Sequence, residues 1–131
     1  MLLEIIIALF LGITTGIITG ITPGIHVNLV SMLVVVFSPL LLTYTTPLVL
    51  GVYIISLALT HTFLDALPSI YLGAPDEAQA LNVLPGHRLL LKGLGHNAVL
   101  CTVIGALGRV LLGVLFFPLF ILSMSWLQPF L

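Results

Sequence analysis

Charged residues are scarce in this sequence: three Lys or Arg and four Asp or Glu stand among 131 residues, which is 5%. A soluble domain carries about 25% charged residues, so the composition excludes that class. The absence of a basic patch excludes nucleic acid as a partner. Because 60% of the residues are hydrophobic, the composition predicts a multi-pass protein of the cell membrane whose main surroundings are the lipid bilayer.

Cysteine is also nearly absent, since Cys101 stands alone in an apolar run. A single cysteine excludes a disulfide framework and a thiol-based metal site. The four histidines are scattered, and there is no Ser nucleophile motif, no His-Glu-x-x-His pair and no phosphate-binding Gly-rich loop. We therefore expect no metal, no cofactor and a function other than catalysis.

The apolar runs are long and lack period-two alternation, which predicts an all-α integral membrane protein. At about 20 residues per span, a single membrane domain over residues 1–131 holds about four transmembrane segments. We expect one or two of these to be broken or re-entrant helices. Residues 1–42 hold the first span, a Pro-Gly break and a second segment, 48–67 a third span, 68–96 a re-entrant or interfacial loop, and 97–128 a C-terminal span.

The direction of insertion depends on very few charges. Arg88 and Lys92 would hold the loop after the third span in the cytoplasm by the positive-inside rule. The N-terminus then lies outside if residues 26–42 cross the membrane, and inside if they are re-entrant.

Three glycines stand four residues apart in the first span: Gly12, Gly16 and Gly20. This spacing puts them on one helix face, where a second backbone can approach closely. Three threonines line a neighbouring polar stripe of the same helix: Thr15, Thr19 and Thr22.

The first span breaks at Thr22-Pro23-Gly24, because Pro23 lacks a backbone donor and Gly24 tolerates positive φ. A broken helix exposes backbone donors that favour an anion, and His26 and Asn28 add further donors. The residues that we expect to bind a solute here are Gly20, Thr22, Pro23, Gly24, His26 and Asn28. The alternative is an ordinary interfacial turn with His26 in the headgroup layer.

A second break of the same kind follows at Gly73-Ala74-Pro75-Asp76, where polar groups again come after a proline. Two such breaks predict paired discontinuous elements that meet at one solute site. The residues expected to contribute are Gly73, Ala74, Pro75 and Asp76. The alternative is a plain loop outside the membrane.

His61 and Asp65 lie at i and i+4, on one helix face. Ionisable groups inside a membrane are costly and mark functional sites, so this pair is a hypothesis for ion or proton coupling. The alternative is that the pair lies at the water boundary, because Pro68 would end the span three residues later.

Arg109 lies near the centre of the fourth apolar stretch if that stretch is one helix. A central Arg costs at least about 2.5–3.5 kcal/mol on insertion scales, so it would need a carboxylate or an anionic ligand as its partner. The alternative is a short helix over 97–108, with Arg109 at the mouth of a span from 110 to about 128.

The chain resembles the large permease subunit of tripartite tricarboxylate transporters. The N-terminal half of that family carries a Gly-rich helix and a Pro-Gly break, matched here by Gly16, Gly20, Pro23 and Gly24. A Gly-x-Pro loop with an Ala-rich helix and a Lys-Gly stretch follow in the family, matched by residues 73–80 and 85–93. The resemblance covers one repeat of a family member, and His26 after Pro-Gly-Ile is similar to divergent, archaeal members.

The resemblance implies a half-transporter that moves a small organic anion such as a carboxylate, coupled to an ion. It implies as partners a second permease half or a second copy of the chain, and an extracytoplasmic solute-binding protein. The chain departs from the family at Asp76, where glycine is usual, and at Arg109, where the family is apolar. Two other functions remain open: a membrane scaffold or assembly subunit that uses the glycine face only for packing, and a lipid-phosphate flippase.

Overall fold

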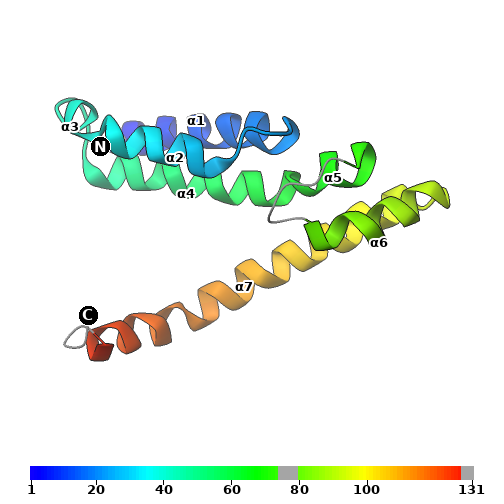
Figure 1. Ribbon diagram of the computed structural model, residues 1–131. Coiled ribbons are helices and arrows are strands. Elements are labelled where there is room, and N and C mark those ends of the chain that lie inside the picture. The colour runs from blue at the N-terminus through cyan, green and yellow to red at the C-terminus, as the bar shows by residue number, and fades with distance from the viewer. Residues whose placement is uncertain (74–79, 128–131) are drawn as a thin grey trace.

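The computed structural model describes the backbone of residues 1–73 and 80–127 and the side chains of residues 1–73 and 85–124. All regular structure in these ranges is helical, as the composition predicts (Figure 1). The helices are α1 (Leu2–Ile21), α2 (Val27–Val36), α3 (Ser38–Leu41), α4 (Pro47–Leu64), α5 (Ala66–Leu72), α6 (Ala80–Leu91) and α7 (Gly95–Leu127).

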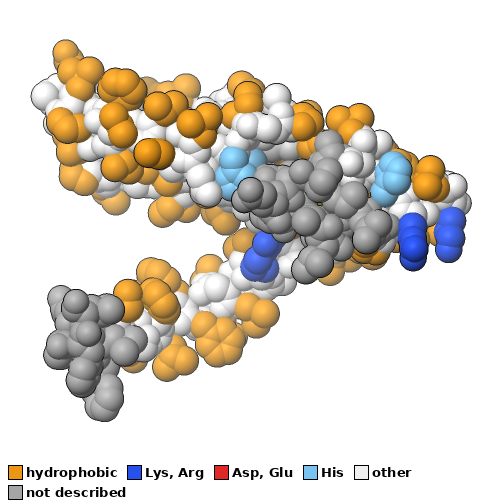
Figure 2. Space-filling model, viewed as in Figure 1, with side chains coloured by type: hydrophobic (Ala, Val, Ile, Leu, Met, Phe, Trp, Pro, Cys, Tyr) orange, Lys and Arg blue, Asp and Glu red, His pale blue; other side chains and the backbone are white. Residues whose placement is uncertain are grey.

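Three helical segments of the described chain are long and apolar enough to cross a membrane: Leu2–Ile21, Pro47–Leu72 and Gly95–Met124. At about 1.5 Å per residue, α1 is about 30 Å long, which matches the hydrocarbon core of a bilayer. Hydrophobic side chains cover the outer surfaces of these helices (Figure 2). The chain is therefore a multi-pass membrane protein, and the shorter apolar helix α2 accompanies the three long segments.

Helices α1 and α4 pack side by side through the glycine face of α1. A Cβ atom added at Gly12 would lie 2.6 Å from the carbonyl oxygen of Tyr53, and one added at Gly20 would lie 2.7 Å from Cβ of Leu64. The predicted close approach is thus confirmed, and the partner backbone comes from the same chain. Within the chain, α4 therefore covers the glycine face of α1.

The same contacts give the direction of the two helices. Later residues of α1 meet later residues of α4, so α1 and α4 are parallel (Figure 1). If both cross the membrane in the same direction, the chain between them has to return across it. Helices α2 and α3 would make this return, with a turn at Phe37 where Ser38-Pro39 predicts an interruption. Residues 26–42 thus run back between the end of α1 and the start of α4 (Figure 1). A full crossing by this segment, with the N-terminus outside by the positive-inside rule, stays a prediction.

The third span does not end at Pro68, contrary to the sequence-based expectation. Pro68 cannot donate to the carbonyl of Leu64, four residues earlier, so α4 ends there. Asp65 keeps helical dihedral angles (φ −60°, ψ −24°), and α5 continues the apolar segment to Leu72. The proline therefore makes a joint within one long segment, and His61 and Asp65 lie at that joint rather than at its end.

Helices α5, α6 and α7 form a second packing unit around a small apolar core. Ala66, Ile70 and Ala98 are buried in this core, and Leu89, Leu90 and Val99 pack against it. The segment 68–96, expected as a re-entrant or interfacial loop, thus contains α6 and most of α5.

Helix α7 is one continuous helix of 33 residues. The alternative of a short helix that ends before Arg109 is therefore wrong. Arg109 lies 14 residues after Gly95 and 15 before Met124, in the middle of the apolar segment. Beyond Arg109 the helix leaves the other helices, and residues 111–124 are all exposed within the chain (Figures 1 and 2).

Candidate functional site

Polar side chains link α1 to α4 along the edge of the glycine contact. The hydroxyl of Tyr53 donates to Oγ1 of Thr15 at 3.2 Å. One turn further along α1, Oγ1 of Thr19 lies 3.0 Å from Nδ1 of His61. Both Thr19 and His61 are buried, each with 3% of its surface exposed. Two of the three threonines of the predicted stripe, Thr15 and Thr19, thus form polar contacts between α1 and α4.

The hydroxyl of Thr19 decides the tautomer of His61. This hydroxyl donates its single hydrogen to the carbonyl oxygen of Gly16 at 3.3 Å. It can then only accept from His61, so Nδ1 of His61 carries a hydrogen and donates it.

His26 caps the helix that follows the break. Its Nδ1 accepts from the backbone N–H of Asn28 at 3.1 Å, and its backbone carbonyl accepts from Leu29 at 3.1 Å. Two of the backbone donors that the break offers to an anion are therefore already bonded to His26. The Asn28 side chain lies on an exposed part of α2.

The break and the joint in the third span meet in space. Thr22 takes an extended conformation and Gly24 has a φ of 88°, as expected for a Pro-Gly break. The ring of His26 then lies 5.2 Å from the ring of His61, between centroids, with the planes tilted by 60°. Residues far apart in the sequence, at the end of α1 and at the end of α4, therefore share one location.

A small cavity of about 100 Å³ lies at this meeting point, and we call it the break cavity. It is lined by Thr19, Gly20, Thr22, Pro23, Gly24, Ile25, His61, Asp65 and Pro68. Four of the residues predicted to bind solute and both predicted coupling residues are in this lining. Because a water molecule occupies about 30 Å³, the break cavity holds about three waters, or one carboxylate group, but not a whole tricarboxylate.

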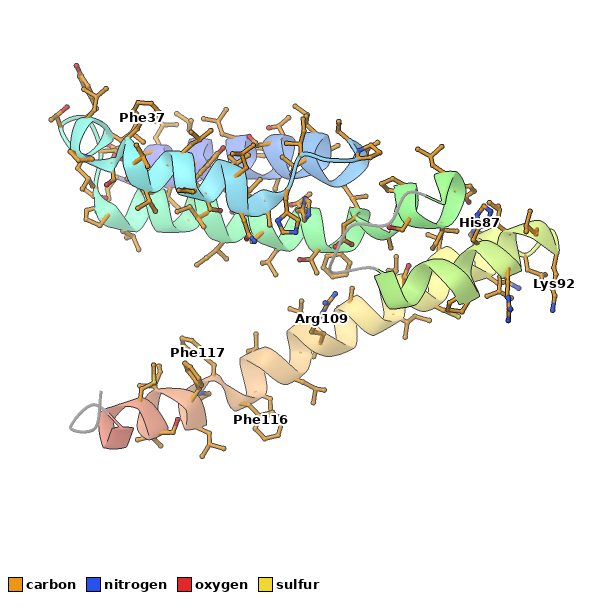
Figure 3. All side chains as sticks on the ribbon, in the orientation of Figure 1. Phe37, His87, Lys92, Arg109, Phe116 and Phe117 are labelled. Atoms are coloured by element: carbon orange, nitrogen blue, oxygen red, sulfur yellow. The ribbon has the colours of Figure 1, made fainter. Side chains whose placement is uncertain are left out.

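A larger cavity of about 400 Å³ lies on the other side of Asp65, and we call it the α7 cavity. It is bounded by Thr62, Phe63, Asp65, Ala66, Pro85, Gly86, Leu89, Ala98, Cys101, Thr102, Gly105, Ala106 and Arg109. Asp65 is in the lining of both cavities. Arg109 points from α7 towards α4 and α5 (Figure 3).

The structure does not bring every predicted residue to this location. Gly73 ends α5 in the left-handed conformation (φ 63°) and lies near the ring of His87, whose Nδ1–H donates to the carbonyl of Ile70 at 3.0 Å. Ala74, Pro75 and Asp76 lie outside the described residues. Within the described part of the chain, no three His, Cys, Asp or Glu side chains gather as a metal site would require.

Several residues of the two cavities were not predicted as functional. Thr19 belongs to the recognised threonine stripe, but only the parallel register of α1 and α4 brings it to His61. The sequence indicates Pro68 only as the end of a helix, whereas in the structure Pro68 lines the break cavity. No sequence motif identifies Thr62, Cys101 or Thr102 as functional residues. Cys101 and Thr102 do share a helix face with Arg109.

Comparison with known proteins gives one family. A family model described as the tripartite tricarboxylate transporter TctA family matches residues 6–130, almost the whole chain. An uncharacterized protein of Methanocaldococcus jannaschii is 37% identical over 71 residues, which are 54% of this chain and 18% of that protein. The match therefore spans less than a fifth of the length of this relative. No solved structure matches the chain.

Proposed function

The chain belongs to the tripartite tricarboxylate transporter TctA family, and from this membership we propose that it is a half-transporter that moves a small organic anion, such as a carboxylate. The match over residues 6–130 is the observation that carries the proposal, because it covers the break, both cavities and the three long apolar segments. The physical character of the chain agrees with it, since buried polar groups inside a membrane protein mark the path of a solute or an ion.

The break cavity is the proposed place where a carboxylate group of the solute or the coupling ion binds. Thr22, Pro23 and Gly24 supply non-helical backbone there, and irregular backbone at membrane depth occurs where it lines such a cavity. The size of the cavity, about 100 Å³, supports a bound group rather than a whole solute. Gly73 to Asp76 are proposed to belong to the same solute path, as the second break of the pair.

His61 and Asp65 are the proposed coupling residues. Nδ1 of His61 lies 3.0 Å from Oγ1 of Thr19, and His61 lines the break cavity, so an ionisable ring stands at this cavity. Asp65 is the carboxylate in the wall of the break cavity and is one helical turn from His61. A proton or a small cation bound at this pair would offset part of the negative charge of the solute.

The proposed partners are a second permease half, or a second copy of this chain, and an extracytoplasmic solute-binding protein. The exposed length of α7 over residues 111–124 supports a partner within the membrane, because the chain itself leaves this helix uncovered. An adjacent open reading frame that matches the rest of the family would identify a second half. A second copy of the chain is proposed to insert in the opposite orientation, as in transporters with inverted repeats. Crosslinking that finds only parallel protomers and no second polypeptide would contradict this inverted homodimer.

Uptake into proteoliposomes tests the proposed function. Liposomes that contain the protein should accumulate at least one radiolabelled compound from a panel of mono-, di- and tricarboxylates, above protein-free liposomes. His26→Ala should reduce this uptake, and Thr14→Val should retain it, because Thr14 is exposed and its hydroxyl bonds only to its own helix at Phe10. If the protein carries none of the carboxylates, either alone or reconstituted together with the second permease half, the transport function is wrong and the scaffold hypothesis takes its place.

A further inference from the structure

One face of α7 forms a whole side of the α7 cavity. The residues on this face are Ala98, Cys101, Thr102, Gly105, Ala106 and Arg109. They are three or four positions apart and so lie on one side of the helix. Five of them have small side chains, and the sixth carries a long cationic one. The small side chains of this face therefore leave open space, and the guanidinium of Arg109 lies beside that space.

Gly105 shows that this space is not used for packing. No atom lies within 4 Å of the position that a Cβ of Gly105 would take, whereas a Cβ at Gly16 would lie 2.7 Å from Cβ of Thr60. The glycines of α1 are required for contact between helices, and Gly105 is not. The cavity volume of about 400 Å³ falls in the usual range of small-molecule sites, about 300–1,000 Å³.

The donor in this wall is Arg109. Its guanidinium offers five N–H groups and no acceptor, in a fork that matches a carboxylate. The hydroxyl of Thr102 donates to the carbonyl oxygen of Val99 at 2.8 Å, so towards the cavity it can only accept. An anion in the α7 cavity would therefore take its strong hydrogen bonds from Arg109, whose position in the middle of a span demands such a partner.

Asp65 also lines this cavity, from the joint between α4 and α5. Among the described residues that line the cavity, Arg109 is the basic side chain and Asp65 the acidic one. The first carboxylate of a solute can bind Arg109. While Asp65 is ionised, each further carboxylate meets this acidic side chain, and the described lining residues offer no second Lys or Arg. Like charges in a low-dielectric site repel strongly, so the wall disfavours solutes with several negative charges.

We propose that the α7 cavity is a solute site in which Arg109 binds one carboxylate and Asp65 selects for solutes that carry a single negative charge. The identity of the solute as a carboxylate rests on the proposed function. The break cavity, with room for one group, and the α7 cavity, with room for a small molecule, are then two successive sites that share Asp65 as their common wall.

Cys101 provides the test, because it is the single cysteine of the sequence and lines the α7 cavity. The rate of its modification by a charged thiol reagent is measured on the purified protein with acetate, succinate or citrate present. Bound solute should slow the reaction, and acetate should protect at lower concentration than citrate. Cys101→Ser should abolish the signal.

Three substitutions separate the contributions of charge and space. Arg109→Gln should raise the half-protecting concentration of acetate at least about tenfold, as expected for a lost charge-assisted pair. Asp65→Asn should lower the half-protecting concentration of citrate at least about threefold, because the substitution removes a negative charge that repels citrate. Gly105→Leu should fill the cavity and remove protection, and Gly113→Leu is the matched control that should retain it, since Gly113 also faces open space but does not line the cavity.

The outcomes distinguish this site from the proposed function. Equal protection in Arg109→Gln and in the unsubstituted protein would overturn the site. Citrate protecting at lower concentration than acetate, with no change in Asp65→Asn, would overturn the assigned selectivity. Carboxylate uptake without any protection of Cys101 would keep the transport function and reject the site. Protection without uptake would support the site and contradict transport.

Discussion

Thr19 and His61 are 42 residues apart in the sequence, and Nδ1 of His61 lies 3.0 Å from Oγ1 of Thr19. They meet because the glycine face lets α1 and α4 approach closely in a parallel register. His61 also lines the break cavity, so the geometry of this cavity depends on the packing of the two helices. Changes at the α1–α4 interface should therefore affect stability and solute binding together.

Thr19→Val should destabilise the protein and reduce uptake, because His61 Nδ1–H would lose its buried acceptor. Hydrogen bonds between membrane helices contribute about 0.6 kcal/mol on average and up to about 1.7 kcal/mol, which sets the expected loss in unfolding free energy. Reversible unfolding in mixed micelles measures it. Thr14→Val, an exposed site on the same helix, is the control. Equal effects of both substitutions would contradict the role given to the Thr19–His61 contact.

Gly16→Ala and Gly51→Ala should have opposite effects on thermal stability. A Cβ at Gly16 would lie 2.8 Å from the carbonyl oxygen of Leu57, so we expect a loss of about 1–3 kcal/mol from overpacking. Gly51 has no atom within 4 Å of its Cβ position, so alanine should be tolerated or stabilise α4 by up to about 1 kcal/mol. Melting curves of the two variants in the same detergent test this, and a stable Gly16→Ala protein would show that α1 and α4 are not in close contact.

His26→Asn separates the capping function of His26 from the chemistry of its ring. Asparagine is a good N-cap residue, so this variant should keep the start of α2, whereas His26→Ala should cost about 1 kcal/mol of stability. Both variants lose the ring that lies 5.2 Å from His61. If the ring takes part in transport, uptake should fall in both variants, and His26→Asn should melt near the unsubstituted protein. Full uptake by His26→Asn would limit His26 to capping.

Asp65→Asn should uncouple solute movement from the ion gradient. The variant keeps the size of the side chain and removes the carboxylate from the wall of both cavities. We expect exchange of solute across the membrane to continue, while accumulation driven by an imposed proton or cation gradient disappears. Measuring counterflow and gradient-driven uptake on the same proteoliposomes distinguishes the two. Gradient-driven accumulation at the unsubstituted level would remove Asp65 from the coupling mechanism.

Local features were predicted well from the sequence, because each depends on a few neighbouring residues. The close-approach face at Gly12, Gly16 and Gly20 and the positive φ of Gly24 follow from spacing and residue type alone. Pro47 begins a helix, as its fixed φ and missing N–H favour. The family assignment also followed from the order of such motifs.

Long-range relationships could not be predicted in the same way. The meeting of Thr19 with His61 requires the register between α1 and α4, which depends on how α2 and α3 return across the membrane. Pro68 was interpreted as the end of a span, although a proline also permits a joint when the chain after it stays helical. The α7 cavity arises from three helices together, and no single segment of the sequence encodes it.

The parallel arrangement of α1 and α4 also restricts how a two-fold permease could be built from this unit. We infer a path that crosses the bilayer with α1, returns with α2 and α3, crosses again with α4 and α5, and returns with α7 (Figure 1). Such a path would put both ends of the described helices on one side. A gene duplication that joined two such units directly would give them the same orientation. An antiparallel pair would require two separately inserted polypeptides, or one additional helix between the units. An even number of crossings per unit would therefore limit the ways in which a carrier with two antiparallel units could evolve.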